Sequence, residues 1–245
     1  MAFSNGTTNQ VVSEMTLTEI VDLIVRQPAP VVCLDTCSLL DVWRTLLRID
    51  VQVLDSAQSV DTVIVTTPPQ LWSVIVDQVQ VEWDRNLPTV RQEAATRLRE
   101  LETALERVHD VVERMPPLTR PHHTSLNSFL LDPFLEGLTK SIFSRSVRLE
   151  LNESAGAKAL RRNLSRRAPA EQGGSIEDCV IIEHYLELAS ALKDRGFANP
   201  VIFVSSNSND YGKPGKLLGS LQAEFDGAGL QFAVHLAHAR SIARW

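Results

Sequence analysis

The chain of 245 residues contains only three cysteines, and it has neither a long apolar run nor an excess of basic side chains. Three cysteines cannot all pair with one another, which excludes a disulfide-rich scaffold and leads us to expect a reducing, cytoplasmic location. The sequence starts with the polar stretch MAFSNGTTNQ, so we expect no signal peptide. A membrane helix needs about 18 consecutive apolar residues, and no stretch approaches that length. We therefore expect no membrane partner.

The charge balance of the chain is acidic, with 30 acidic and 24 basic side chains and a net charge of -6. A protein that holds nucleic acid through its overall charge is therefore disfavoured, whereas a local basic patch is compatible with this balance. Hydrophobic residues make up 44% of the chain and charged residues 22%, which is typical of globular proteins. We expect a flexible tail at residues 1–14 and a single domain at residues 15–245.

Short apolar runs rich in β-branched residues predict buried strands, and stretches with helical spacing lie between them. The predicted strands are residues 31–34, 61–67, 200–205 and 230–236. The predicted helices are residues 17–25, 38–49, 71–79, 90–115, 133–143 and 176–192. Strands that alternate with helices indicate an α/β fold with a mainly parallel central sheet.

The predicted helix at residues 90–115 is unusually long. Its apolar residues recur every three or four positions, which indicates one apolar stripe along the helix. Two interpretations are open: the stripe packs on the helix's own domain, or the helix is an arm or a dimer contact. A homodimer is compatible with the second interpretation.

Acidic residues stand at or near the ends of three predicted elements. Asp35 directly follows the first predicted strand, and Asp210 lies in the polar run after the third. Because the carboxyl ends of parallel strands meet at one edge of a sheet, both side chains are expected at that edge, where functional groups gather. Asp178 lies in the first turn of the predicted helix at residues 176–192, where an acid also favours the helix dipole. Each acid alone has a structural explanation, so only their combination points to a site.

Glu82 is a further acidic candidate, towards the end of the predicted helix that follows the second predicted strand. Taken alone, it is better explained as a surface glutamate that pairs with Arg85 or Arg91. It becomes a candidate for function only together with the aspartates.

Four short segments together resemble the motifs of PIN-domain ribonucleases. They are CLDTCSLL at residues 33–40, VEW at 81–83, DCVI at 178–181 and FVSSNSNDY at 203–211. Their order and their predicted elements match the family over residues 31–236, and the likeness is greatest to larger members with a long helical insertion. The resemblance implies a three-layer α/β/α sandwich with a mainly parallel central sheet and a helical insertion at about residues 85–152. No segment of that insertion is predicted to be the family's remaining strand.

The resemblance also implies a metal-dependent ribonuclease that hydrolyses phosphodiester bonds in RNA. Four acids would be the catalytic residues and the ligands of one or two Mg²⁺ or Mn²⁺ ions: Asp35, Glu82, Asp178 and Asp210. Three polar residues would hold the late loop, a metal-bound water or a phosphate: Thr36, Ser205 and Asn207. Two details depart from the usual pattern, because Ser205 stands where threonine is common and Glu177 precedes Asp178.

The chemistry of such a cluster follows from its charge. Neighbouring carboxylates repel and raise one another's pKa unless a cation joins them. Their hard oxygen atoms suit Mg²⁺ or Mn²⁺ rather than zinc. An ion of this kind activates water, orients a phosphate and offsets the charge on the leaving oxygen.

A basic segment precedes the predicted helix at residues 176–192. It contains five basic residues and no acid: Lys158, Arg161, Arg162, Arg166 and Arg167. The segment is either a solvated helix face or a set of contacts to the RNA phosphate backbone beside the acidic pocket. In the second case, neutralising its four arginines together weakens RNA binding and flattens its salt dependence.

Three other functions compete with the nuclease. A catalytically silent PIN-like module would bind nucleic acid or a protein without cutting, and the presence of all four acids argues against it. A phosphotransfer enzyme of the haloacid dehalogenase type requires a second acid two residues after Asp35, where Cys37 stands. A Rossmann dinucleotide site is disfavoured because no glycine-rich turn follows the first predicted strand.

Overall fold

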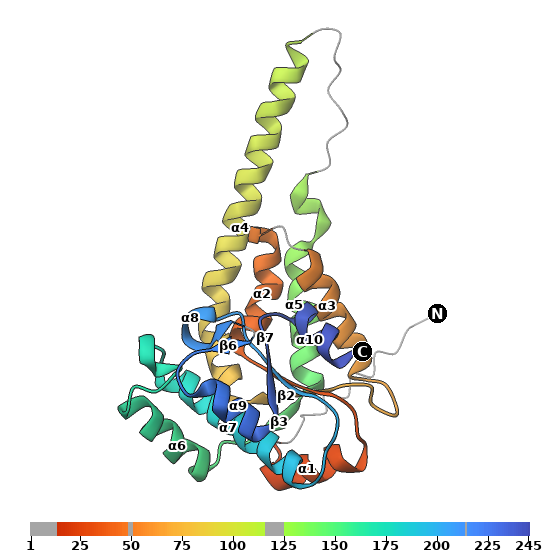
Figure 1. The fold of residues 1–245 in the computed structure, drawn as a ribbon. Coiled ribbons are helices and arrows are strands. Elements are labelled where there is room, and N and C mark those ends of the chain that lie inside the picture. Colours follow the sequence, from red (N-terminus) through yellow and green to blue (C-terminus); the bar gives the residue numbers. More distant parts are fainter. Residues whose placement is uncertain (1–13, 49–50, 116–124, 214) are drawn as a thin grey trace.

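The computed structural model describes residues 14–48, 51–115, 125–213 and 215–245, so the predicted tail at residues 1–14 falls almost wholly outside it. At its centre lies a sheet of five parallel strands in the order β3-β2-β1-β4-β7 (Figure 1). The strands are β1 (Val31–Leu34), β2 (Trp72–Val76), β3 (Val147–Leu149), β4 (Val201–Val204) and β7 (Leu230–Ala233). β1 and β4 are buried along their whole length, as expected for apolar strands covered on both faces.

Helices cover both faces of the sheet, which confirms the predicted three-layer α/β/α sandwich (Figure 1). One layer is built around α7 and contains α1 (Leu17–Arg26), α6 (Glu153–Leu164), α7 (Ile176–Asp194) and α9 (Leu221–Ala228). The other contains α2 (Thr36–Arg48), α3 (Val51–Val63), α4 (Asp77–Glu113), α5 (Leu131–Arg145) and α10 (Leu236–Ala243). Short elements complete the described chain: η1 (Leu126–Phe129), η2 (Ala170–Gln172), α8 (Ser208–Tyr211), β5 (Gly212–Lys213) and β6 (Lys216–Leu217).

Several helices form where local signals predicted them. α1 begins behind Thr16, whose side chain forms a capping box with Glu19. α7 begins in the same way, with Ser175 and Asp178 as the capping pair. α5 covers its predicted range, and α2 begins at Thr36 rather than at residue 38. Capping side chains and apolar spacing depend only on neighbouring residues. The sequence alone therefore indicates approximately where these helices begin.

The strand predicted at residues 61–67 is wrong. α3 continues to Val63, and Val65 beyond it is 51% exposed. The buried apolar residues of α3 are spaced one helical turn apart: Val53, Ala57 and Val60. This helical face begins upstream of the β-branched run and overrides its local preference for a strand.

The second strand in the chain is instead β2, inside the segment 71–79 whose apolar spacing predicted a helix. Ser73 and the three residues after it are all buried, and a run buried on both faces has no periodicity that separates strand from helix. β3 is a three-residue edge strand with half-buried Arg148 at its centre, which explains why the insertion showed no strand signal. β7 ends at Ala233, three residues before the predicted end of that strand.

α4 is longer than predicted and projects from the body of the protein (Figure 1). It runs through 37 residues, about 55 Å at 1.5 Å per residue, and begins at Asp77 rather than at residue 90. Its first half packs on the sandwich through Val79, Trp83 and Val90, and the remainder extends beyond the sheet. The helix therefore both packs on its own domain and forms an arm. Within the described ranges no helix, α4 included, combines the length and apolar character needed to cross a membrane.

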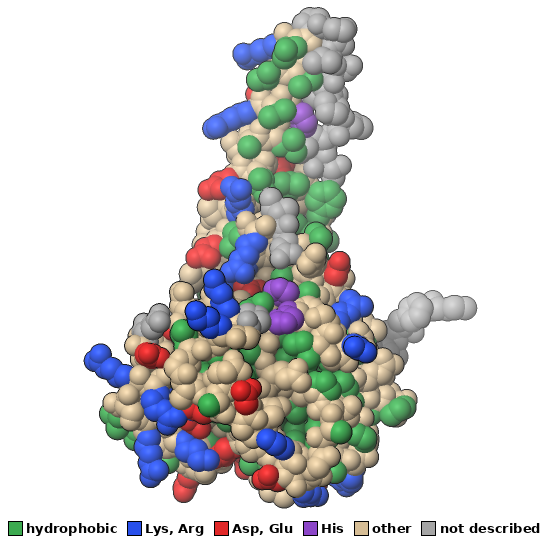
Figure 2. Space-filling model, viewed as in Figure 1, with side chains coloured by type: hydrophobic (Ala, Val, Ile, Leu, Met, Phe, Trp, Pro, Cys, Tyr) green, Lys and Arg blue, Asp and Glu red, His purple; other side chains and the backbone are tan. Residues whose placement is uncertain are grey.

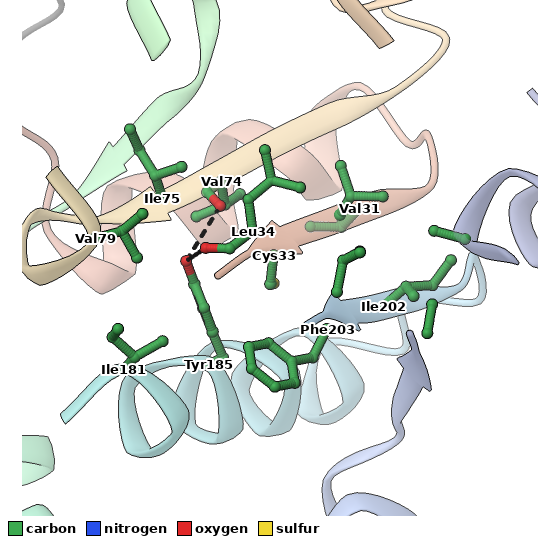
Figure 3. Close-up of a cluster of buried hydrophobic side chains, with 14 of the residues drawn as sticks. Val31, Cys33, Leu34, Val74, Ile75, Val79, Ile181, Tyr185, Ile202 and Phe203 are labelled. Atoms are coloured by element: carbon green, nitrogen blue, oxygen red, sulfur yellow. Dashed lines mark hydrogen bonds between the residues drawn. The ribbon is translucent and has the colours of Figure 1, made fainter. Parts of the chain in front are cut away.

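A buried tyrosine ties α7 to the ends of the central strands (Figure 3). The Tyr185 hydroxyl donates to the Leu34 carbonyl at 2.6 Å, with a longer contact of 3.4 Å to the Val74 carbonyl, and accepts from the Val76 amide at 3.3 Å. Leu34 and Val76 are the last residues of β1 and β2. The tyrosine therefore fixes α7 beside the strand end that precedes Asp35.

Tyr185→Phe is expected to lower the free energy of unfolding by about 1–3 kcal/mol, because it removes hydrogen bonds to backbone groups inside an apolar core. Urea denaturation should show a lower midpoint with an unchanged m-value. Tyr211→Phe is the matched control, since Tyr211 is also fully buried but bonds the Asp178 carbonyl at a long 3.5 Å. Equal losses in the two variants would contradict the role given to the Tyr185 hydroxyl.

Candidate active site

The candidate site lies at the carboxyl edge of the sheet, between β1 and β4. These strands are neighbours, yet the chain leaves them toward opposite faces, into α2 after β1 and toward α9 after β4. Two neighbouring strands whose connections leave toward opposite faces form a topological switch point of the sheet. Open parallel sheets bind ligands in the crevice at such a point. Asp35 and Ser205, which directly follow the two strands, both stand there.

The Asp35 carboxylate is buried and held from both sides. It is 1% exposed, and its Oδ2 accepts a hydrogen bond from the Ser205 hydroxyl at 2.5 Å. Its Oδ1 accepts from the Thr36 amide at 2.9 Å. Three residues that the motifs singled out are thus brought together at the ends of two neighbouring strands.

Glu82 reaches the same place from α4, although it lies 46 positions after Thr36. The Thr36 hydroxyl donates to Glu82 Oε2 at 2.9 Å. Glu82 is 8% exposed and Arg85 pairs with Glu177 instead, so the interpretation as a surface glutamate is wrong. The second oxygen, Glu82 Oε1, is buried without a hydrogen-bond partner among the described residues. An unpartnered buried carboxylate oxygen is costly unless a donor or a cation meets it.

Asp178 caps the N-terminus of α7, as its position in the first turn of that helix indicates. Its Oδ2 accepts hydrogen bonds from the Ser175 amide at 2.9 Å and the Ser175 hydroxyl at 2.8 Å. The Ser175 hydroxyl accepts in turn from the Asp178 amide at 3.1 Å. This capping box uses one carboxylate oxygen, and Oδ1 is not part of it.

Asp210 is fixed by the loop that follows β4. The Asn207 side-chain amide donates to Asp210 Oδ2, and the Asn207 backbone amide donates to the Ser205 hydroxyl at 3.2 Å. The loop before α7 packs closely on this region, because a Cβ on Gly174 would lie 2.4 Å from the Pro169 carbonyl oxygen and 3.3 Å from Asp210 Cγ. Ser205 therefore links Asp35, which follows β1, to the loop that carries Asp210.

Burial and mutual repulsion raise the pKa of several of these acids. Burial is the main reason why the pKa of Asp35 is raised to about 7, and the charges of Asp178 and Glu82 add to it. The pKa of Glu82 is raised by burial first and then by the charges of Asp178 and Glu177. The pKa of Asp178 is raised by burial first and then by the charges of Asp210 and Glu177. Each of the four motif acids either raises the pKa of another or has its own pKa raised by one, so we treat them as one group, called the acid cluster below.

The acid cluster fits a hard divalent cation in its chemistry. Its donors are carboxylate oxygens, the type that Mg²⁺ and Mn²⁺ prefer, and the buried Glu82 Oε1 has no other partner among the described residues. Among these residues, however, no three His, Cys, Asp or Glu side chains already stand close enough together to hold an ion. Mg²⁺ is usually held by one or two carboxylates together with several waters, so water molecules would complete the coordination of an ion bound here.

One residue of the basic segment, Arg162, is buried, so it belongs neither to a solvated helix face nor to an exposed contact with RNA. Its side chain is 3% exposed. Its guanidinium donates to Glu183 Oε1 at 2.7 Å, to the Ala168 carbonyl at 2.6 Å and to Glu224. Arg162 is thus engaged inside the protein, and in this conformation it is not available for the predicted phosphate contact.

Two other members of the segment are exposed but paired. Lys158 pairs with Glu187 at 2.7 Å, and Arg167 pairs with Glu224. Arg161 and Arg166 are also exposed, and the described residues provide no ion-pair partner for them. On the face shown in Figure 2, basic side chains lie along the arm and are scattered over the body, with acidic ones among them. The predicted basic segment therefore contributes fewer uncompensated charges than its composition indicates.

Sequence reasoning passed over the segment that directly follows Asp210. There β5 and β6 pair antiparallel and form a small hairpin, with Lys213 opposite Lys216. The signal was the stretch GKPGK at residues 212–216, in which a proline–glycine pair marks a turn and each flank carries a lysine.

All four motif acids belong to one cluster at the carboxyl edge of the sheet. Comparisons with protein-family models, with curated proteins and with solved structures found no match for this chain. The likeness to PIN-domain ribonucleases accordingly rests on the four sequence motifs and stays a prediction.

Proposed function

We propose that the protein is a ribonuclease that depends on Mg²⁺ or Mn²⁺ and hydrolyses phosphodiester bonds of RNA at the acid cluster. The observation that carries the proposal is the gathering of four acids at the switch point of the sheet, where three of them have a raised pKa. The choice of RNA as substrate comes from the motif resemblance.

The residues of the cluster have different tasks in this proposal. Asp35, Glu82 and Asp178 would hold the metal, directly or through water. When bound, the ion supplies an activated water and offsets charge at the phosphate. The hydroxyl groups of Ser205 and Thr36 orient the carboxylates of Asp35 and Glu82.

The loop after β4 completes the site. Asp210 adds negative charge beside Asp178, and Asn207 holds the Asp210 carboxylate in place. The Ser205 hydroxyl connects this loop to Asp35.

Purified full-length protein is expected to cut a labelled mixed-sequence single-stranded RNA with Mn²⁺ or Mg²⁺ and not with EDTA. Glu82→Gln should lower the rate by more than about 100-fold, since even the loss of an outer-shell partner costs 10- to 100-fold at metal sites. Glu93→Gln is the matched control, because Glu93 is an exposed glutamate on the same helix. Its cutting rate should equal that of the wild type.

The remaining outcomes separate the competing functions. Metal binding without cutting would indicate a restricted substrate or a missing partner. Neither cutting nor metal binding would favour the catalytically silent module that binds nucleic acid or a protein. Cutting that is equally strong in Glu82→Gln would place the active site elsewhere.

A further inference from the structure

The β5–β6 hairpin is fixed close to the acid cluster. It begins two residues after Asp210, directly behind the fully buried Tyr211. The Leu218 amide donates to the Tyr211 carbonyl at 3.0 Å and closes the base of the hairpin. Gly212 has φ +96°, and a Cβ there would lie 2.6 Å from the Lys216 carbonyl oxygen. β5 therefore leaves α8 in close contact with β6. This contact fixes the position of the hairpin relative to Asp210.

Two like charges face each other across this hairpin. Lys213 and Lys216 are directly paired in the antiparallel register. Directly paired residues share one face of the ribbon with Cβ atoms about 5 Å apart, and like charges in such a pair are destabilising. Both lysines are exposed, and neither has an acidic partner among the described residues. An anion bound between them would remove this repulsion.

Three basic side chains elsewhere on the protein are already paired with acids, whereas Arg161 and Arg166 of the basic segment are exposed without an ion-pair partner among the described residues. Arg85 pairs with Glu177, next to the acid cluster, at 3.0 Å. Arg162 and Arg167 share Glu224. A polyanion that approaches a cluster of carboxylates is repelled unless positive charge lies nearby. The hairpin lysines supply such charge without first having to break an ion pair.

We propose that Lys213 and Lys216 bind the phosphate backbone of single-stranded RNA and position it at the acid cluster. The substrate class rests on the proposed nuclease function, but the contact itself concerns binding and not cutting. Lys213 lies three positions after Asp210, so the Cα atoms of the two residues are at most about 11 Å apart. A single-stranded RNA held by the hairpin would therefore pass close to Asp210 of the acid cluster.

Binding of a labelled mixed-sequence single-stranded RNA in EDTA, measured over a range of salt concentrations, tests the proposal on the full-length protein. The double variant Lys213→Gln, Lys216→Gln is expected to bind more weakly. The slope of its log affinity against log salt should fall by about 1.4, since each contact to a single strand contributes about 0.7. Its melting temperature should be unchanged or higher, because the repulsion between the lysines is removed.

The double variant Arg107→Gln, Arg114→Gln is the matched control, since it removes the same charge from exposed positions on the projecting arm, which the motifs do not connect with RNA. It should change the slope less than the hairpin variant does. Equal changes in the two double variants would mean that binding follows net charge, and they would overturn the proposal. An unchanged slope in the hairpin variant, or no RNA binding by the wild type, would also overturn it.

The two proposals fail in distinguishable ways. If the hairpin variant shows the expected slope while the wild type does not cut RNA with Mn²⁺, the proposed hairpin contact is supported and the proposed nuclease function is contradicted. If the wild type cuts RNA and the slope of the hairpin variant is unchanged, the proposed nuclease function is supported and the proposed hairpin contact is contradicted.

Discussion

Replacing Asp35 with asparagine is expected to stabilise the metal-free protein above about pH 7 and at the same time to abolish cutting. The reason is that the pKa of Asp35 is raised from 3.8 to about 7, chiefly by burial. The folded protein therefore keeps this proton through a range of pH in which the unfolded chain has released it. The stability contributed by the protonated form is fully present below about pH 4 and is lost as the pH rises through 7.

The size of the effect follows from the difference between the two pKa values. A pKa raised from 3.8 to about 7 corresponds to about 4 kcal/mol of lost stability once the carboxylate is charged. Asp35→Asn removes that loss and preserves the local geometry, because an amide can accept from the Thr36 amide and donate to the Ser205 hydroxyl. The same substitution removes a proposed metal ligand, which is why activity is expected to disappear while stability rises.

Thermal unfolding in EDTA at about pH 5 and about pH 8 measures this difference, which should be larger at the higher pH. Mn²⁺ should then raise the melting temperature of the wild type and not that of Asp35→Asn, because a ligand that binds only the folded state stabilises it. Asp41→Asn is the contrasting control, since Asp41 is equally buried but pairs with Arg44 and Arg48. It should lose stability. A lower melting temperature for Asp35→Asn at about pH 8 would contradict the prediction.

Arg162→Met is expected to destabilise the protein by about 3–5 kcal/mol, the range found when one partner of a buried ion pair is removed. The Arg162 side chain is 3% exposed, and it contacts the carboxylates of Glu183 and Glu224. Without the guanidinium these acids lose their counter-charge, and the Ala168 carbonyl loses a donor. Urea denaturation of the full-length protein measures the loss.

Arg161→Met is the control for this prediction, since Arg161 precedes Arg162 on the same helix and is exposed. Its effect should stay within about 0.5 kcal/mol. Adding Glu183→Gln to Arg162→Met should recover part of the loss, because it removes the uncompensated charge. Equal effects of Arg161→Met and Arg162→Met would show that the buried ion pair does not support the fold. If an Arg162 variant binds RNA more weakly, we expect the cause to be its lower folding stability and not the loss of a phosphate contact.

The sequence by itself determined the features that depend on neighbouring residues. Uninterrupted apolar runs determined β1 and β4, since a strand covered on both faces needs no alternation. Because both strands are parallel, their carboxyl ends had to meet, and this alone predicted that Asp35 and the loop after β4 share an edge. Capping pairs determined where α1 and α7 begin. Each of these signals lies within a few residues of the element it specifies.

The tertiary structure decided the features that depend on partners far along the chain. Residues 63–65 and 74–76 are both the triplet Val-Ile-Val. Only the helical face that starts earlier in α3 excludes the first triplet from the sheet. Glu82 is buried because Thr36 and the sheet edge receive it across 46 positions. Arg162 is engaged with Glu224 across 62 positions, while the adjacent Arg161 is exposed. Composition and periodicity cannot distinguish such neighbours, because burial and ion pairing are set by the packing of distant elements and not by local preference.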